Sequence, residues 1–331
     1  MTSLLLGVVS ALIATNQIVA PTNPLPNLTN ATLAAPNPDD PVEKQYHQLM
    51  ADDDEAQAEV DKWIHDNQEF ATQGAGISRE GLSRRILERF APVRKGYETF
   101  LQQHTNHVRA RIAYASFLDD IHEEEGSIAQ LELAREIDPS EPSVWNNLAN
   151  HYGHLGPVTK AFDYYAKAIA LNPHESVYYH NFGTTVFLFR KDAREHYQIN
   201  EQQVFDKALA LYHEAMKLAP NDFPLASDVA QTFYGIRPSR PDDALRAWTN
   251  AFNLANDDIE REGVHTHFAR VKLHAGRFDE ARLHLNNVTN EMYGELKRRL
   301  TRSLNDEEAK AKDTNAPPAG TNAPPTEAAK K

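Results

Sequence analysis

Residues 142–175 constrain the fold more than any other stretch, because they contain two helical apolar stripes separated by a Gly-Pro break. Their sequence is PSVWNNLANHYGHLGPVTKAFDYYAKAIALNPHE. The first stripe has the spacing i, i+3, i+4, i+7 of one helix face and consists of Trp145, Leu148, Ala149 and Tyr152. The second consists of Ala161, Tyr165 and Ala168. Gly156 and Pro157 are typical of one helix ending and the next beginning, and Pro173 closes the unit. The stretch therefore predicts a helix-turn-helix unit.

The same pattern recurs along the chain. A large residue in each second helix returns at spacings of 34, 34, 47, 36 and 37, at Tyr97, Leu131, Tyr165, Tyr212, Trp248 and Leu285. A small residue follows three positions later at Ala134, Ala168, Ala215 and Ala251. Another small residue comes early in the second helix, at Ser127, Ala161, Ala208, Ala244 and Ala281. Helices pack closely only where side chains are small, with one large residue filling the gap, so these series predict stacked helix pairs.

These motifs resemble the tetratricopeptide repeat (TPR), with Trp-x2-Leu, Tyr, Ala-x3-aromatic, Ala and a late Pro in residues 142–175. The departures are Ala149 where Gly is usual and Tyr165 where Phe is usual. The resemblance implies an all-α fold, a right-handed solenoid of helix-turn-helix repeats. We expect a degenerate repeat at 74–107 and five TPR-like repeats at 108–290. The resemblance does not extend to residues 1–73.

The spacing of 47 marks an insertion near residues 190–204 in the third of the five repeats. Asn200-x-x-Gln203 has the form of a capping box, which predicts the start of a lengthened second helix. Insertions in solenoids fall on one face, which is often functional, but a tolerated loop explains this insertion equally well.

The N-terminal region divides into three predicted segments. Residues 1–20 form an apolar, charge-free leader, whose run at 4–14 has the length of a signal-peptide core and is too short to span a bilayer. Residues 21–41 are a Pro/Asn-rich linker, and residues 42–73 an acidic helical segment. The leader predicts export to the periplasm, the envelope or the medium. Because it lacks the usual Lys/Arg start, a disordered leader on a cytoplasmic protein is the alternative.

The C-terminal region has two predicted parts. Residues 291–312 are expected to form a helix that caps the open end of the solenoid, with Met292, Tyr293, Leu296 and Leu300 on one face. In residues 313–331 the sequence Thr-Asn-Ala-Pro-Pro occurs twice. Such a segment buries too little apolar surface to offset its ordering entropy, so we expect a disordered tail.

Composition argues against several functions. The net charge is −13, and residues 39–70 hold eleven Asp/Glu against two Lys, so no basic patch for nucleic acid is present. Cysteine is absent, which excludes disulfides and thiolate metal sites. No phosphate-binding glycine loop, HExxH zinc motif or GxSxG elbow occurs, and His151 with His154 are expected to be surface residues. We therefore expect no enzyme activity, cofactor, metal or small-molecule substrate.

The TPR resemblance implies that the partner binds in a concave groove. On a helical wheel, positions 2, 5, 9 and 12 of each first helix form a stripe beside the packed positions. The resemblance assigns that stripe to the groove, and its residues are Arg109, Ser116, Asn146, Asn150, His180, Thr184, Ser227, Gln231, Tyr234, Thr266 and Arg270.

These side chains are mostly neutral hydrogen-bonding groups, which suit the amides and carbonyls of a peptide main chain. The Lys/Asn/Arg clamp of chaperone-binding TPR proteins is not reproduced, because only Arg109 occupies a comparable position. This argues against an adaptor for chaperone tails. In the alternative, Asn147 and Asn181 merely tie the repeats together, and the groove is empty or covered by the leader.

The sequence therefore predicts a scaffold that binds a partner peptide or helix, in cell-envelope assembly if it is exported. A regulatory or accessory subunit of an enzyme, such as a glycosyltransferase-like one with catalysis in a separate chain, is the alternative.

Overall fold

The repeating large and small residues form the contacts that pair the helices in the computed structural model. The six large residues of the second helices are all 3% exposed or less, from Tyr97 to Leu285. The small residues beside them are 4% exposed or less, at Ser127, Ala134, Ala161, Ala168, Ala208, Ala215, Ala244, Ala251 and Ala281. The prediction that small side chains line the helix contacts is thus confirmed.

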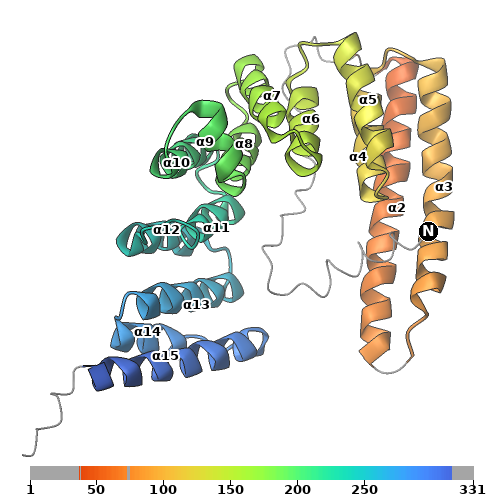
Figure 1. The fold of residues 1–331 in the computed structure, drawn as a ribbon. Helices are drawn as coiled ribbons and strands as arrows, with labels where there is room; N and C mark the ends of the chain where they lie inside the picture. The colour runs from red at the N-terminus through yellow and green to blue at the C-terminus, as the bar shows by residue number, and fades with distance from the viewer. Residues whose placement is uncertain (1–36, 38, 73–74, 315–331) are drawn as a thin grey trace, which may run out of the picture. The chain divides into compact units, whose positions relative to one another are not determined.

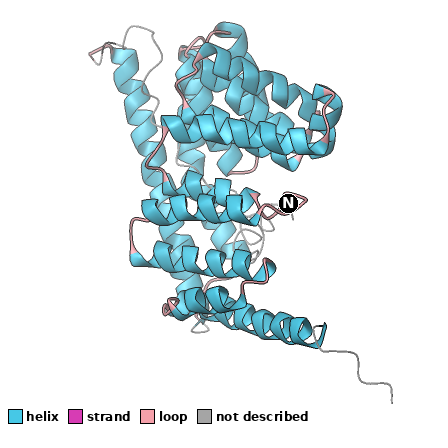
Figure 2. Ribbon diagram, turned by 90° about the vertical axis from the view of Figure 1, so that its left-hand side faces the viewer, coloured by secondary structure: helices cyan, strands magenta, loops and turns pink. Residues whose placement is uncertain are grey.

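The structure describes residues 37, 39–72 and 75–314, and over these residues it contains helices and loops without a strand (Figure 2). The fold class is the predicted one, an all-α TPR-like α-solenoid. The leader 1–20, most of the linker 21–41 and residues 315–331 of the predicted tail lie outside the described residues. The chain separates into two units, Met1–Ala219 and Pro220–Lys331.

The first unit contains one long helix pair followed by three hairpins (Figure 1). The long pair is α2 (Pro41–Thr72) with α3 (Arg79–Gln103). The hairpins are α4 (Val108–Asp120) with α5 (Glu124–Ile137), α6 (Pro142–Leu155) with α7 (Val158–Leu171), and α8 (Ser176–Leu188) with α10 (Glu201–Leu218).

The second unit contains two hairpins and a terminal helix. The elements are α11 (Phe223–Thr232) with α12 (Pro241–Leu254), α13 (Asp258–His274) with α14 (Phe278–Asn286), the 3-10 turn η1 (Glu291–Tyr293), and α15 (Gly294–Thr314).

The degenerate repeat predicted at 74–107 is not a hairpin. Residues 79–103 form one continuous helix, α3, which runs through Pro92 and pairs with α2. Its buried residues, Phe90, Val93, Tyr97, Phe100 and Leu101, follow a single stripe that no turn interrupts. The packing is close at Gly96, where an added Cβ would lie 2.9 Å from Leu49 of α2.

The insertion near 190–204 folds as a short helix, α9 (Arg190–Tyr197), followed by a left-handed residue at Gln198. Tyr197 and His196 lie against Phe162 of α7, with ring centroids 5.5 and 5.4 Å apart. The predicted capping box at Asn200 and Gln203 is present and starts α10, which at 18 residues is longer than α7 with 14.

At the C-terminal end, α15 packs on α13 and α14 through Leu300 and Leu304, against a cluster that includes Leu273 and Leu285. The expectation that Met292 belongs to the packed face is wrong, because its side chain is 69% exposed. Met292 lies in η1, whose geometry departs from the helical wheel used to place it.

Trp145 differs from the other large residues, because it is only half-buried. Its Nε1 donates to the carbonyl of Pro139 at 2.9 Å, and its ring meets Tyr164 edge-on with centroids 5.0 Å apart. Tyr165 and Trp248, by contrast, are 2% and 1% exposed.

Replacing Tyr165 or Trp248 by alanine should therefore lower the free energy of unfolding more than replacing Trp145. We expect Tyr165→Ala and Trp248→Ala each to lower the free energy of unfolding by about 3–5 kcal/mol. Trp145→Ala should cost roughly 1–2 kcal/mol, since its side chain is only half-buried. Chemical denaturation measures all three, with Met292→Ala as an exposed control. Equal losses at positions 145 and 248 would contradict this packing.

Candidate partner-binding surface

The predicted groove residues lie on the first helices of the hairpins, in two separate groups. In the first unit, α4, α6 and α8 hold Arg109, Ser116, Asn146, Asn150, His180 and Thr184. In the second unit, α11 holds Ser227 and Gln231, α13 holds Thr266 and Arg270, and Tyr234 lies in the turn after α11. Most are half-buried and Arg270 is exposed, but Asn146 and Thr266 are buried.

Asn146 links neighbouring hairpins and does not line a surface. It is 5% exposed, and its Oδ1 accepts from Asn181 Nδ2 of α8 at 3.2 Å. Its Nδ2 donates to Asn147 Oδ1 at 3.1 Å. The alternative in which Asn147 and Asn181 tie repeats together therefore applies to this position.

Thr266 is also wrong as a groove residue, because only 2% of it is exposed. Its hydroxyl donates to the carbonyl of Gly263 at 2.7 Å within α13, so its polar atom is satisfied internally. Both errors occur on the predicted stripe of a first helix, where packing covers the side chain.

Arg109 is occupied by another part of the chain. Its guanidinium forms an ion pair with Glu43 of α2 and lies over the Tyr46 ring at 5.0 Å. Glu43 Oε1 is also 3.5 Å from His107 Nε2, and both of these side chains are 12% exposed. The N-terminal end of α2 thus pairs with Arg109, the only residue at a position comparable to the carboxylate clamp of chaperone-binding TPR proteins.

The other polar groups of the first unit reach the second helices. Asn150 Oδ1 accepts from the Tyr165 hydroxyl at 2.6 Å, and Thr185 Oγ1 donates to that hydroxyl at 3.3 Å. Thr184 Oγ1 lies 3.0 Å from the Tyr212 hydroxyl. Such bonds fix the orientation of Asn150 and Thr184 while both side chains remain half-buried.

An aromatic stack shapes the surface of the second unit. The His267 ring lies flat on Trp248, with centroids 3.9 Å apart and planes 7° apart. The Tyr234 hydroxyl is 2.9 Å from His267 Nδ1, and the Arg270 guanidinium lies 4.4 Å above the Tyr234 ring. Tyr234 lies beyond the end of α11 at Thr232, so the expectation that it continues this helix is wrong.

Burial fixes the protonation of this stack. It lowers the pKa of His267 to about 3, with a further contribution from Arg270, so the imidazole is neutral near pH 7. Burial also raises the pKa of the Tyr234 hydroxyl, which therefore stays protonated. A neutral ring with a protonated hydroxyl beside it lets Tyr234 donate to His267 Nδ1.

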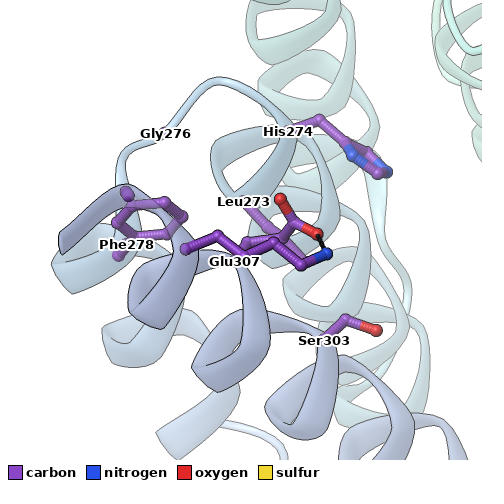
Figure 3. Close-up of a pocket in the computed structure, with 8 residues that line it drawn as sticks. Leu273, His274, Gly276, Phe278, Ser303 and Glu307 are labelled. Carbon is purple, nitrogen blue, oxygen red and sulfur yellow. Dashed lines mark hydrogen bonds and ion pairs between the residues drawn. The ribbon is translucent and has the colours of Figure 1, made fainter. Parts of the chain in front are cut away.

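Arg270 is the exposed end of the stack. Among the described residues it contacts the Tyr234 ring but has no carboxylate within ion-pair distance. His274 follows one turn later on α13 and borders a pocket of about 590 Å³. Figure 3 shows the pocket between α13, the start of α14 and α15, with Phe278 on one side and Glu307 across it. Arg270 does not line this pocket, but because its own side chain is exposed, an anionic or polar group can approach it from solvent.

Sequence reasoning does not find the histidine contacts of the second unit. The spacing places His267 on the opposite side of a helix from His265 but gives no sign of its stacking on Trp248. His265 meets His284 of α14 with Nδ1 atoms 2.9 Å apart, a contact between residues 19 positions apart. No local pattern reveals such pairs.

Neither a metal centre nor a membrane span emerges from the described residues. Over 37, 39–72 and 75–314, no three His, Asp or Glu side chains converge in a way that would hold a metal ion. No helix in those ranges is both long and apolar enough to cross a bilayer.

No family model matches the chain. A stretch of 93 residues is 31% identical to the photosystem I assembly protein Ycf3 of Acaryochloris marina, and the match spans 28% of this chain and 56% of that protein. The chain thus spans little more than half the length of this relative.

Two solved structures are similar at low identity. The crystal structure of MamA is 18% identical with a TM-score of 0.40, covering 53% of this chain and 93% of MamA. The type IV pilus biogenesis factor PilW is 14% identical with a TM-score of 0.48, covering 61% and 85%. Since both TM-scores are below 0.5, the assignment of the repeats rests on the helices and their buried positions.

One acid and one histidine should give the two units opposite responses to pH. Partial desolvation beside α2, then repulsion from Asp53 and Asp119, raises the pKa of the otherwise exposed Asp120 to about 6. Burial, then Lys272 and His265, lowers the pKa of His284 to about 4. The unfolded values are about 3.9 for Asp and about 6.5 for His. As pH falls from about 6.5 to about 4, proton binding at Asp120 therefore stabilises the folded first unit. Over the same range the unfolded second unit binds a proton at His284 that the folded unit does not bind. The folded second unit therefore loses stability as the pH falls.

Two variants test these signs. Compared with the wild type, Asp120→Asn should stabilise the first unit more at about pH 7.5 than at about pH 5. The reason is that the carboxyl of Asp120 is ionised in the folded unit only at the higher pH, and the variant removes that unfavourable charge. His284→Asn should raise the stability of the second unit more at about pH 5 than at about pH 7.5, because only at the lower pH does the unfolded wild type gain a proton at this position. Hydrogen exchange resolved by helix reports each unit separately. The same pH trend in both variants would contradict the assignment.

Proposed function

We propose that this chain is a non-enzymatic scaffold that binds segments of a partner protein on the first helices of the hairpins in each of its two units. One observation carries the proposal. Polar side chains recur at the same helical positions in both units and keep part of their surface open to solvent, at Ser116, Asn150, His180, Thr184, Ser227, Gln231 and Arg270, and Tyr234 of the turn after α11 contacts Arg270.

The chemistry of these residues favours an extended segment with one acidic group. Asn150 and Gln231 carry amides, which match the donors and acceptors of a peptide main chain. Arg270 provides a cation, held over Tyr234 and without a carboxylate partner among the described residues, for one Asp, Glu or terminal carboxylate. Arg109 is excluded from this set, because Glu43 neutralises it.

The similarity to an assembly protein supports a binding role over catalysis. Ycf3 is named a photosystem I assembly protein, and 93 residues of this chain are similar to it. The charge-free apolar leader favours export as the setting, with cell-envelope assembly as the role, and a cytoplasmic adaptor is the alternative.

Photo-cross-linking in the producing cells tests where the partner binds. A photoreactive residue at position 150 or 231 should cross-link to the same partner, because both lie on first helices. The same residue at Leu283 of α14, which is 65% exposed, is the matched control and should give none. Arg270→Ala should reduce the cross-linking from position 231 about tenfold, as loss of a charge-assisted hydrogen bond predicts. Arg109→Ala should not reduce it.

Cross-links from Leu283 or from Lys191 of α9, with none from positions 150 and 231, would place the partner elsewhere. That result would contradict the binding surface while leaving a scaffold function open.

Export is tested by fractionation and N-terminal sequencing of the tagged protein. We expect the chain outside the cytoplasm with Met1 removed together with the leader. Replacing Leu5 and Leu6 by Asp should retain it inside, because charges disrupt an apolar signal core. A wholly cytoplasmic protein with Met1 intact would contradict export.

A further inference from the structure

We propose that the far end of the α2–α3 pair docks against the same surface of a second copy of this chain. This surface, the distal hairpin, consists of residues 61–72 of α2 and 79–89 of α3. The proposal concerns self-association and does not depend on the partner-binding surface.

The distal hairpin exists because α2 and α3 are longer than the helices that cover them. With 32 residues, α2 is about 48 Å long, whereas α4 with 13 residues is about 20 Å long. The fully buried residues of the cluster shared with α4 end at Val60 on α2 and begin at Phe90 on α3, and Trp63, Ile64 and Ile86 pack against it partly buried. Figure 1 shows both helices continuing past α4. Beyond these points α2 and α3 pack mainly on each other among the described helices.

The two helices remain in register there. Arg89 Nε lies 2.6 Å from Glu59 Oε2, and the Arg85 guanidinium lies 3.7 Å above the Trp63 ring. At the tip, Asn67 Oδ1 accepts from the backbone N–H of Ile77 at 2.7 Å. The distal hairpin is therefore an ordered pair of helices with a defined surface.

That surface exposes apolar side chains on both helices. Phe70 and Leu87 are 51% and 47% exposed, and Trp63 and Ile64 are half-buried while packing against the core cluster of the first unit. Trp63 and Phe70 are seven positions apart, which places them on one helix face. Two packed helices leave one apolar face of the pair exposed to solvent. A second pair of helices packed on that face would bury it and complete a four-helix bundle.

Charge complementarity selects a second copy as that layer. In the distal hairpin, α2 carries Asp61, Asp66 and Glu69 against Lys62, a net charge of −2. On α3 the corresponding residues are Arg79, Arg84 and Arg85 against Glu80 and Glu88, a net charge of +1, since Arg89 is already paired with Glu59. A two-fold symmetric contact places each α2 against the partner copy's α3, so the opposite charges meet twice. The surface is thus complementary to itself.

The test measures the mass of the full chain against concentration by sedimentation equilibrium. We expect a monomer–dimer equilibrium with a dissociation constant on the order of micromolar. Phe70→Glu should weaken the dimer at least about tenfold, since it places a charge in the apolar contact. Phe70 is 51% exposed, so the fold tolerates the change. Leu283→Glu and Met292→Glu change residues of the second unit that are 65% and 69% exposed and should leave the dimer unchanged.

A charge exchange tests the pairing itself. Asp66→Arg and Arg84→Glu should each weaken self-association, because each puts like charges together at both ends of the symmetric contact. An equimolar mixture of the two variants should recover a dimer of wild-type strength. In that mixed dimer the arginine introduced in one copy meets the glutamate introduced in the other, and the native Asp66 and Arg84 still meet at the second contact.

A wild-type chain that stays monomeric at every concentration would overturn the proposal, and binding of that monomer to vesicles of anionic phospholipid would assign the surface to a membrane. A dimer that Leu283→Glu dissociates and Phe70→Glu does not would equally overturn it, by moving the contact to the second unit.

Discussion

Every hairpin of this chain depends on the close approach of helices at small side chains, with one large residue closing the gap. Ala134, Ala168, Ala215 and Ala251 are completely buried, and any larger side chain there would force the helices apart. The large residue one turn away, such as Trp248 at 1% exposure, fills the remaining space. Since the packed stripe uses one face of each first helix, another face remains free for polar side chains. The candidate partner surface is a consequence of that division.

The N-terminal helix α2 sets the limits of this surface. Glu43 and Tyr46 hold Arg109, and Tyr97 donates to the buried Asp53 at 2.5 Å. One end of α2 thereby closes the hairpin of α4 and α5, while its other end extends past α4 as part of the distal hairpin. The carboxylates of α2 form ion pairs with two neighbouring helices: Glu43 pairs with Arg109 of α4, and Glu59 pairs with Arg89 of α3.

The sequence predicts the repeats well, because a hairpin's core is local and periodic. The buried series from Tyr97 to Leu285 and the capping box at Asn200 both follow from spacing alone. It predicts side-chain exposure less well, because exposure depends on which other helix lies opposite. A helical wheel places Asn146 beside the packed stripe but contains no information about Asn181, 35 residues away. Nor does a helical wheel show that Arg109 is paired with Glu43, which lies 66 residues before it. Long-range contacts of this kind also decide that α3 is one helix and that His267 stacks on Trp248.

The central claim is that partners bind to the open faces of the first helices. Hydrogen exchange of the full chain, with and without a purified partner, tests it most directly. We expect binding to slow exchange in α6, α8, α11 and α13 and to leave α7, α10 and α14 unchanged. Slower exchange confined to the second helices or to α9, with the first helices unaffected, would contradict it.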